Sequence, residues 1–208
     1  MEINVQKTSS VRFLGKADIS GIKEEILAFK ESFWDEHHAI SPNGNKAKVL
    51  KEVKHIVFKF SFKSQYEEQV YEYFALPIWQ SWKSRLLPIF DAVTAPYGYK
   101  NRLYPRVMLA KLQAGGKIPH HIDGNYLSSR PHKIHIPFKT NGQCFFFVSG
   151  VKYKFEEGFA YEVNNGAPHA VENDSAEDRI HLIFECLDAD AQEPETRAKL
   201  ADDHFAQV

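Results

Sequence analysis

Between residues 106 and 187 the chain alternates short apolar runs with turn residues. Each run spans about five to eight residues and ends at Gly, Asn or Ser, which is typical of strands joined by tight turns. Many short strands without intervening helices favour a β-sandwich or barrel. The predicted strands are 107–112, 133–138, 143–148, 151–155, 159–163, 169–172 and 179–187.

The N-terminal part mixes strand and helix patterns. Residues 11–14 partly alternate, which indicates a short strand. Ser20 stands at an N-cap position before apolar residues with helical spacing, so one helix is predicted from Ser20 to about Trp34. The apolar positions of this helix are Ile22, Ile26, Phe29 and Phe33.

A strand and a second helix are predicted further along. Residues 56–62 alternate Ile or Phe with Val, Lys and Ser, which predicts a half-buried strand. Residues 78–93 have apolar positions at helical spacing, with Pro88 expected to kink or split the helix. Trp79 and Trp82 are interpreted as packing residues of this helix.

Composition limits the function classes. A chain of 208 residues with a net charge of −1 suits one domain with its own core and gives no reason to expect nucleic acid or an anionic membrane as partner. No stretch approaches the roughly 20 apolar residues of a membrane span, and the first residues lack a secretion signal. We therefore expect a cytoplasmic protein in which Cys144 and Cys186 are buried reduced thiols. The oligomeric state is left open.

Two segments are strongly charged. Six lysines and one acid lie within 46–63, which indicates a solvated strand face or, alternatively, a docking surface for an acidic partner. Six acids and two basic residues lie within 188–208, which predicts a surface helix or tail.

The candidate chemistry centres on His121 and Asp123. Residues two apart on an extended segment point to the same side, so this pair can bind one ion. His169, which follows a turn, is the candidate third ligand. Two histidines and one carboxylate on one face leave open positions on iron(II) for a co-substrate and dioxygen. A lone His-x-Asp match is weak, and His37, His38, His55 and His204 are interpreted as ordinary core or surface histidines.

Arg179 opens the last predicted strand and shares a face with His181 and Ile183. If that face points into the barrel, the guanidinium needs an anion and can clamp a carboxylate with two parallel hydrogen bonds. The alternative is an exposed arginine paired with a nearby acid. The candidate acids are Asp174, Glu177 and Asp178.

Several separate motifs, kept in order, resemble the aspartyl/asparaginyl β-hydroxylase family of iron(II)- and 2-oxoglutarate-dependent dioxygenases. They are LQAGGKIPHHID at 112–123, KIHIP at 133–137, Glu157-Gly158, HAVEN at 169–173 and RIHL at 179–182. The resemblance covers roughly residues 105–187.

The resemblance implies a mainly β fold, a double-stranded β-helix (jelly-roll, cupin-like) with flanking N-terminal helices. Residues 1–187 would form a single dioxygenase domain. Within it, 1–104 would pack on the barrel and 105–187 would form the catalytic core, and 188–208 would be the acidic helix or tail.

The resemblance also implies roles for the site residues. His121, Asp123 and His169 would hold iron(II), and Arg179 would bind the distal carboxylate of 2-oxoglutarate. The family's Arg-x-His pair reads Lys133-Ile134-His135 here, so Lys133 offers a point charge in place of a fork. Arg130 is an alternative contact. The best-known mammalian members lack the carboxylate ligand, whereas this chain has Asp123.

The implied activity is hydroxylation of an amino-acid side chain, of the aspartyl/asparaginyl type in a peptide or protein, with dioxygen and 2-oxoglutarate giving succinate and carbon dioxide. Alternatives are a hydroxylase of a free amino acid such as proline, a non-catalytic cupin-like metal-binding protein and, less favoured by the charge, a nucleobase oxygenase. The loop 124–130 is a candidate for placing the substrate, with a plain connecting loop as the alternative. His120 is expected to point away from His121.

Overall fold

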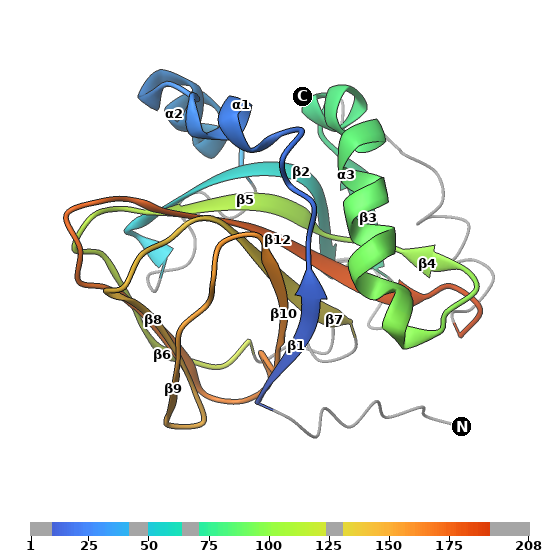
Figure 1. Ribbon diagram of the computed structural model, residues 1–208. Coiled ribbons are helices and arrows are strands. Elements are labelled where there is room, and N and C mark those ends of the chain that lie inside the picture. The colour runs from blue at the N-terminus through green and yellow to red at the C-terminus, as the bar shows by residue number, and fades with distance from the viewer. Residues whose placement is uncertain (1–9, 42–49, 64–70, 124–130, 192–208) are drawn as a thin grey trace.

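The computed structural model describes residues 10–41, 50–63, 71–123 and 131–191, which form two antiparallel β-sheets (Figure 1). The larger sheet has eight strands in the order β1-β10-β7-β12-β5-β2-β3, with β4 paired to β12. Its strands are β1 (Val11–Lys16), β2 (Val53–Lys63), β3 (Tyr71–Ala75), β4 (Arg102–Leu103), β5 (Val107–Leu112), β7 (His132–Lys139), β10 (Phe159–Val163) and β12 (Arg179–Asp188).

The smaller sheet has the order β6-β11-β8-β9. From β5 onward the chain passes repeatedly between the two sheets, because β5, β7, β10 and β12 belong to the larger sheet and the strands between them to the smaller one. This alternation is the double-stranded β-helix, so the predicted fold class is confirmed. The strands of the smaller sheet are β6 (Lys117–His121), β8 (Cys144–Val148), β9 (Val151–Tyr153) and β11 (His169–Asn173).

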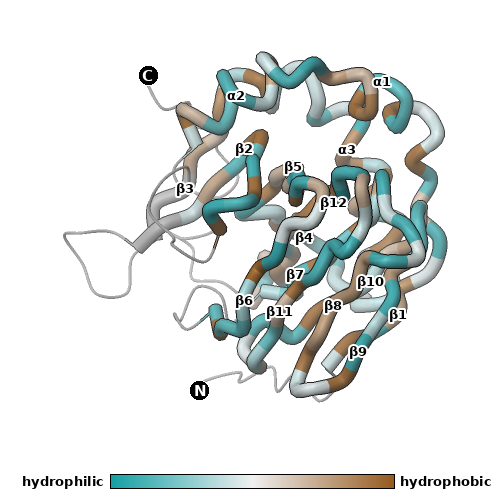
Figure 2. Tube along the Cα trace, turned by 90° about the vertical axis from the view of Figure 1, so that its left-hand side faces the viewer, coloured by the Kyte–Doolittle hydropathy of each residue, from teal (hydrophilic) through white to brown (hydrophobic). Residues whose placement is uncertain are grey.

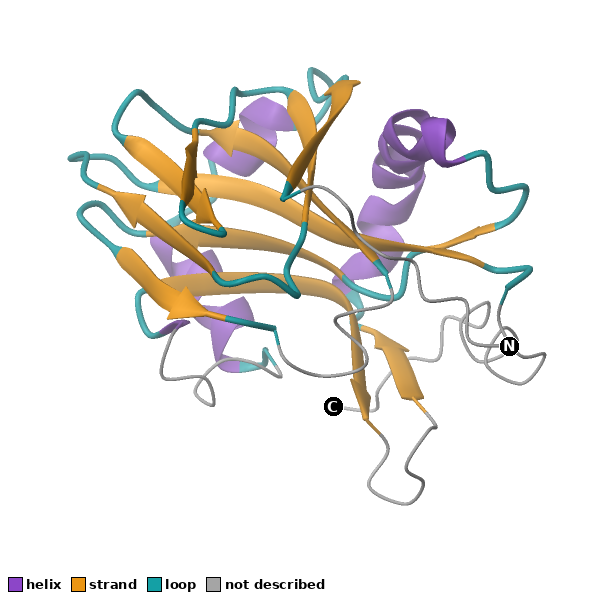
Figure 3. Cartoon of the chain, turned by 90° about the horizontal axis from the view of Figure 1, so that it is seen from below, coloured by secondary structure: helices purple, strands orange, loops and turns teal. Residues whose placement is uncertain are grey.

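Helices cover the outer face of the larger sheet (Figures 1 and 3). Alternate residues of β12 face this layer, where the Phe184 ring stacks on that of Phe90 with centroids 4.1 Å apart. The other residues of β12 face the smaller sheet, and alternating hydropathy along the strands is visible in Figure 2. The helical elements are α1 (Lys23–Leu27), α2 (Glu31–Ala39), α3 (Ile78–Thr94) and the 3₁₀ turn η2 (Ala95–Tyr97).

The larger sheet is buried on both faces in its centre. Every residue of β5 is buried, and so are residues 55–61 of β2. The prediction of a half-buried strand is therefore wrong in its exposure over 56–61, because Ile56 and Phe58 pack with the helices and Val57 packs with Met108 and Leu76.

The first predicted helix is two helices. Ser20 is not its cap, since its hydroxyl donates to Asp18 Oδ1 at 2.7 Å, and α1 begins at Lys23. On one continuous helix the side chains of Ile26 and Trp34 would point in directions about 80° apart around the helix axis, so they would not face the same part of the core. The extended backbone of Lys30 (φ −66°, ψ 154°) breaks the helix, and both side chains are buried in the same core.

The second predicted helix is confirmed as α3, which continues through Pro88. Trp79 and Trp82 are buried packing residues, as predicted. The seven predicted strands are all present: β5 and β10 have the predicted bounds, and the ends of the other five differ by at most two residues. Cys144 and Cys186 are buried free thiols, which also agrees with the prediction.

The basic segment 46–63 is only in part a solvated face: Lys51 is exposed, but two lysines of β2 have partners within the protein. Lys54 forms ion pairs with Glu31 and Asp35 of α2, and Lys59 is buried with its ammonium 5.6 Å from the Trp79 ring centroid. The lysines at 46 and 48 and the tail from 192 onward lie outside the described residues. Within the described residues, no helix combines the length and apolarity needed to cross a membrane.

Candidate metal centre and co-substrate pocket

His121 and His169 are directly opposite each other in the β6–β11 pair. Their ring centroids are 4.1 Å apart. His121 Nδ1 lies 2.9 Å from the Pro119 carbonyl and His169 Nδ1 lies 3.0 Å from the Ala167 carbonyl. A carbonyl only accepts, so each Nδ1 carries the proton and each Nε2 is left with a free lone pair. Both imidazoles are therefore in the tautomer that binds a metal through Nε2.

Asp123 follows the end of β6 and is held by residues from other elements. Its backbone N–H donates to the Asn165 carbonyl at 3.0 Å. Its Oδ2 accepts from Lys133 Nζ at 2.6 Å and from Asn165 Nδ2 at 3.3 Å, while Oδ1 lies 3.6 Å from His121 Nε2. Burial alone would raise the pKa of Asp123, but Lys133, His169 and His121 together hold it below its ordinary value. The carboxylate is therefore anionic.

The donor set of these three residues fits a divalent iron. One ligand atom from each of His121, Asp123 and His169 lies within 4.8 Å of the others. Two imidazoles and one carboxylate are the set that binds iron(II) with positions left open. Burial lowers the pKa of His169, which favours the neutral ring that a metal requires. The structure thus brings together all three residues predicted as ligands.

Arg179 lies inside the barrel and is 4% exposed. Its Nε and Nη2 lie 3.0 and 2.7 Å from the two ring nitrogens of His181; a neutral imidazole has one acceptor, so only one contact is a hydrogen bond. Its guanidinium also lies 5.5 Å from the Phe146 ring centroid. Burial lowers the pKa of Arg179 to about 9, which reflects a cation placed without an anion.

The alternative pairing of Arg179 with a nearby acid is not observed. Within 10–41, 50–63, 71–123 and 131–191, no carboxylate forms an ion pair with Arg179. Asp174 pairs with Lys117 and Glu177 with Lys139, and Asp178 accepts from the Ala114 N–H.

A row of polar side chains links Arg179 to the three predicted metal ligands. The His181 and His135 rings are 5.9 Å apart, and His135 lies two residues from Lys133 on β7 and on the same face. Burial lowers the pKa values of both histidines well below the ordinary value, so both rings are neutral. His135 Nδ1 is buried and has no hydrogen-bond partner among the described residues, which leaves a polar atom for a ligand.

Sequence reasoning missed Asn165, which it treated only as a turn residue, and the contact between Lys133 and Asp123. His120 is exposed, as expected for a residue that points away from the site. Arg130 and the loop 124–130 lie outside the described residues.

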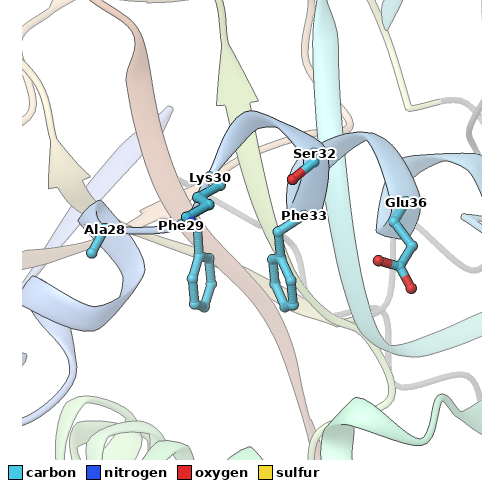
Figure 4. A pocket seen from close by; sticks show the side chains of 6 residues that line it. All are labelled: Ala28, Phe29, Lys30, Ser32, Phe33 and Glu36. Atoms are coloured by element: carbon cyan, nitrogen blue, oxygen red, sulfur yellow. The ribbon is translucent and has the colours of Figure 1, made fainter.

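A separate hollow lies in the helix layer, and Figure 4 shows the side chains that line it. It encloses about 270 Å³ at the junction of α1 and α2. None of the predicted site residues contributes to it. Its lining residues are Ala28, Phe29, Lys30, Ser32, Phe33 and Glu36.

Three solved structures share this fold at low sequence identity. A 2-oxoglutarate-iron(II) oxygenase family oxidoreductase from Burkholderia pseudomallei has a TM-score of 0.51 and 14% identity, covering 90% of this chain and 92% of that one. The nickel complex of the non-heme monooxygenase ThoJ has a TM-score of 0.54 and 14% identity, covering 88% and 75%. A Trichoplax adhaerens prolyl hydroxylase in complex with a hypoxia-inducible-factor peptide has a TM-score of 0.52 and 13% identity, covering 92% and 87%.

The double-stranded β-helix and the His-Asp-His set define the class of iron(II)- and 2-oxoglutarate-dependent oxygenases. The sequence model of the aspartyl/asparaginyl beta-hydroxylase family matches residues 17–189. The chain belongs to this family, and it is an enzyme that uses iron(II), 2-oxoglutarate and dioxygen. The match includes the N-terminal helices, which the motifs did not cover. No curated protein sequence matches the chain.

Proposed function

We propose that this enzyme hydroxylates an amino-acid side chain of the aspartyl/asparaginyl type in a peptide or protein and releases succinate and carbon dioxide. The description of its family supports the residue type. The observation that carries the co-substrate assignment is Arg179, a buried cation that faces the site and has no carboxylate partner among the described residues. A dicarboxylate is the ligand that such a cation needs.

In this proposal His121, Asp123 and His169 hold iron(II) on one face. When bound, the iron couples oxidative decarboxylation of 2-oxoglutarate to hydroxylation of a nearby C–H bond. Each imidazole keeps its proton on Nδ1, bound to a backbone carbonyl, so neither ring takes part in proton transfer. Their role is to fix the position of the metal.

The co-substrate lies along the row from the metal ligands to Arg179. Arg179 binds its distal carboxylate, and the unpartnered Nδ1 of His135 provides a further polar contact. The Lys133 ammonium has three N–H donors, and its bond to Asp123 uses one of them. We assign its other donors to the co-substrate carboxyl group nearest the metal.

Aromatic side chains lie beside this row: the Phe146 ring centroid is 5.5 Å from the Arg179 guanidinium and 5.2 Å from the His135 ring centroid. The Phe146 and Phe155 rings stack with centroids 5.0 Å apart, and Phe155 in turn stacks on Tyr161 at 4.3 Å. Both phenylalanines are buried. Apolar surroundings exclude water and so strengthen the ion pair between Arg179 and a bound carboxylate.

The test uses the full chain purified without metal under anaerobic conditions. Iron(II), 2-oxoglutarate and dioxygen are added, and succinate is followed by NMR with pools of peptides that contain Asp or Asn and, separately, with free amino acids including proline. We expect iron-dependent succinate that rises with the peptide pools. Stimulation by free amino acids alone would contradict the peptide substrate.

His121→Ala should lose both metal binding and turnover. His120→Ala is the matched control, because the neighbouring ring is exposed, and it should retain both. If no condition gives iron-dependent succinate and His121→Ala binds metal as the wild type does, the proposed enzyme site is wrong.

A further inference from the structure

Among the described residues, the contact between Lys133 and Asp123 is the shortest hydrogen bond that a metal-ligand candidate makes with another element. The Lys133 ammonium lies 2.6 Å from Asp123 Oδ2, and the two side chains are 17% and 21% exposed. Lys133 comes from β7 in the larger sheet, whereas Asp123 follows β6 of the smaller sheet. The pair therefore connects the two sheets at the metal centre.

The two oxygens of Asp123 have different surroundings. Oδ2 receives both Lys133 Nζ and Asn165 Nδ2, at 2.6 and 3.3 Å. Oδ1 points to the side of His121, 3.6 Å from its Nε2. The backbone N–H of Asp123 is also fixed, by the Asn165 carbonyl at 3.0 Å. A carboxylate held in this way presents one defined oxygen to a metal.

We propose that Lys133 is a positioning residue for the metal centre: it holds Oδ2 of Asp123 so that Oδ1 alone is offered to the metal. The inference rests on the ligand set of the proposed function. It extends that function, because it makes metal affinity depend on a residue that does not touch the metal. Partners of this kind change metal affinity about 10- to 100-fold in other proteins.

A simple charge effect predicts the opposite sign. The Lys133 ammonium is a cation close to a divalent cation, so the removal of its charge would by repulsion alone tighten metal binding. The loss of positioning, in contrast, would weaken metal binding. The direction of the change in metal affinity therefore separates the two explanations. The Asp123→Gly background is a second test, because it has no carboxylate for Lys133 to position.

The experiment titrates the metal-free full chain with cobalt(II) in the absence of 2-oxoglutarate, by calorimetry and by the cobalt absorption bands. It compares the wild type, Lys133→Met, Asp123→Gly and the double variant in a double-mutant cycle. We expect Lys133→Met to bind cobalt(II) about tenfold more weakly than the wild type. In the Asp123→Gly background the same change should leave the affinity unchanged or tighten it.

Lys139→Met is the matched control. Lys139 lies on the same strand, and its ammonium pairs with Glu177 at a distance of 3.3 Å. The cobalt(II) affinity of this variant should equal that of the wild type. Circular dichroism checks folding, and Lys133→Gln replaces Lys133→Met if the latter does not fold. Unchanged or tighter binding by the Lys133 variant, or an equal loss in both backgrounds, would overturn the inference. If the wild type binds no cobalt(II), the proposed metal centre fails as well, which distinguishes that failure from a loss of the positioning role alone.

Discussion

His121 and His169 face each other across one strand pair. In both residues the imidazole is oriented by a hydrogen bond from Nδ1 to the backbone carbonyl two residues earlier. The orientation of both imidazoles is thus set within their own segments. Asp123 differs, because its direction depends on Lys133 and Asn165 from elsewhere in the fold. Two of the three proposed ligands are therefore fixed by local structure, and the third is fixed by tertiary structure.

Arg179→Met should weaken 2-oxoglutarate binding by at least about 30-fold, since removing one partner of a buried charge pair costs about 2 kcal/mol or more. Methionine keeps the buried volume close to that of the arginine stem. Binding is measured by calorimetry on the manganese(II)-loaded chain without oxygen. Cobalt(II) affinity of the same variant should equal that of the wild type. Equal losses of metal and 2-oxoglutarate would show that Arg179 acts on the fold and does not hold the co-substrate.

His55 should make the protein less stable in acid. Burial first, and then His38 and Lys133, lower the pKa of His55 to about 4. Below pH 6.5 the His55 side chain of the unfolded chain therefore binds a proton that the folded chain does not bind. The free energy of unfolding therefore falls between about pH 6.5 and 4, by about 2 kcal/mol from this residue at pH 4.5. The free energy of unfolding in urea is measured at pH 7 and at pH 4.5. Its decrease between the two pH values should be smaller for His55→Leu than for the wild type, by about 2 kcal/mol.

The exposed His120 provides the control for this measurement. His120→Leu should keep the pH dependence of the wild type. Three other buried histidines with lowered pKa values, His135, His169 and His181, contribute in the same direction in every variant, so the comparison isolates His55. An identical pH dependence for His55→Leu and the wild type would show that His55 is charged to the same extent in the folded and unfolded chains.

Gly116→Ala should destabilise the protein by about 1–3 kcal/mol. A Cβ at this position would lie 2.9 Å from the Gln113 carbonyl oxygen and 2.9 Å from Leu112 Cδ1, and Leu112 is fully buried. Thermal unfolding should show a lower Tm. Gly142→Ala is the control, because its Cβ would meet only Lys154 Nζ at 3.9 Å, and it should stay within about 0.5 kcal/mol. A Tm for Gly116→Ala that matches that of the control would mean that the 113–116 turn shifts freely.

The sequence pattern predicted those parts of the fold that depend on neighbours along the chain. Strand β10 matched the predicted 159–163, because turn residues bound it on both sides. The break between α1 and α2 was not predicted, because the spacing of apolar residues from Ile22 to Phe33 suits one helix. Two helices are required only because Ile26 and Trp34 pack in the same core.

The same distinction holds for the site. The motif resemblance singled out His121, Asp123 and His169, and the structure brings them within reach of one ion. The role of Asn165 could not be predicted, because its side chain meets Asp123 only after β6 and the turn before β11 come together. The burial of Arg179 likewise depends on the closure of the barrel and not on local pattern.

Strand β12 carries pocket residues and core residues in strict alternation: Arg179 and His181 face the site, while Ile180 and Leu182 face the helices. A slip of one residue would bury the guanidinium among the helix-side hydrophobic residues and turn isoleucine toward the co-substrate. Insertions in the preceding turn are therefore tolerated only where they preserve this register. Strand β12 can therefore change by substitution, whereas an insertion or deletion within it would exchange its site face with its core face.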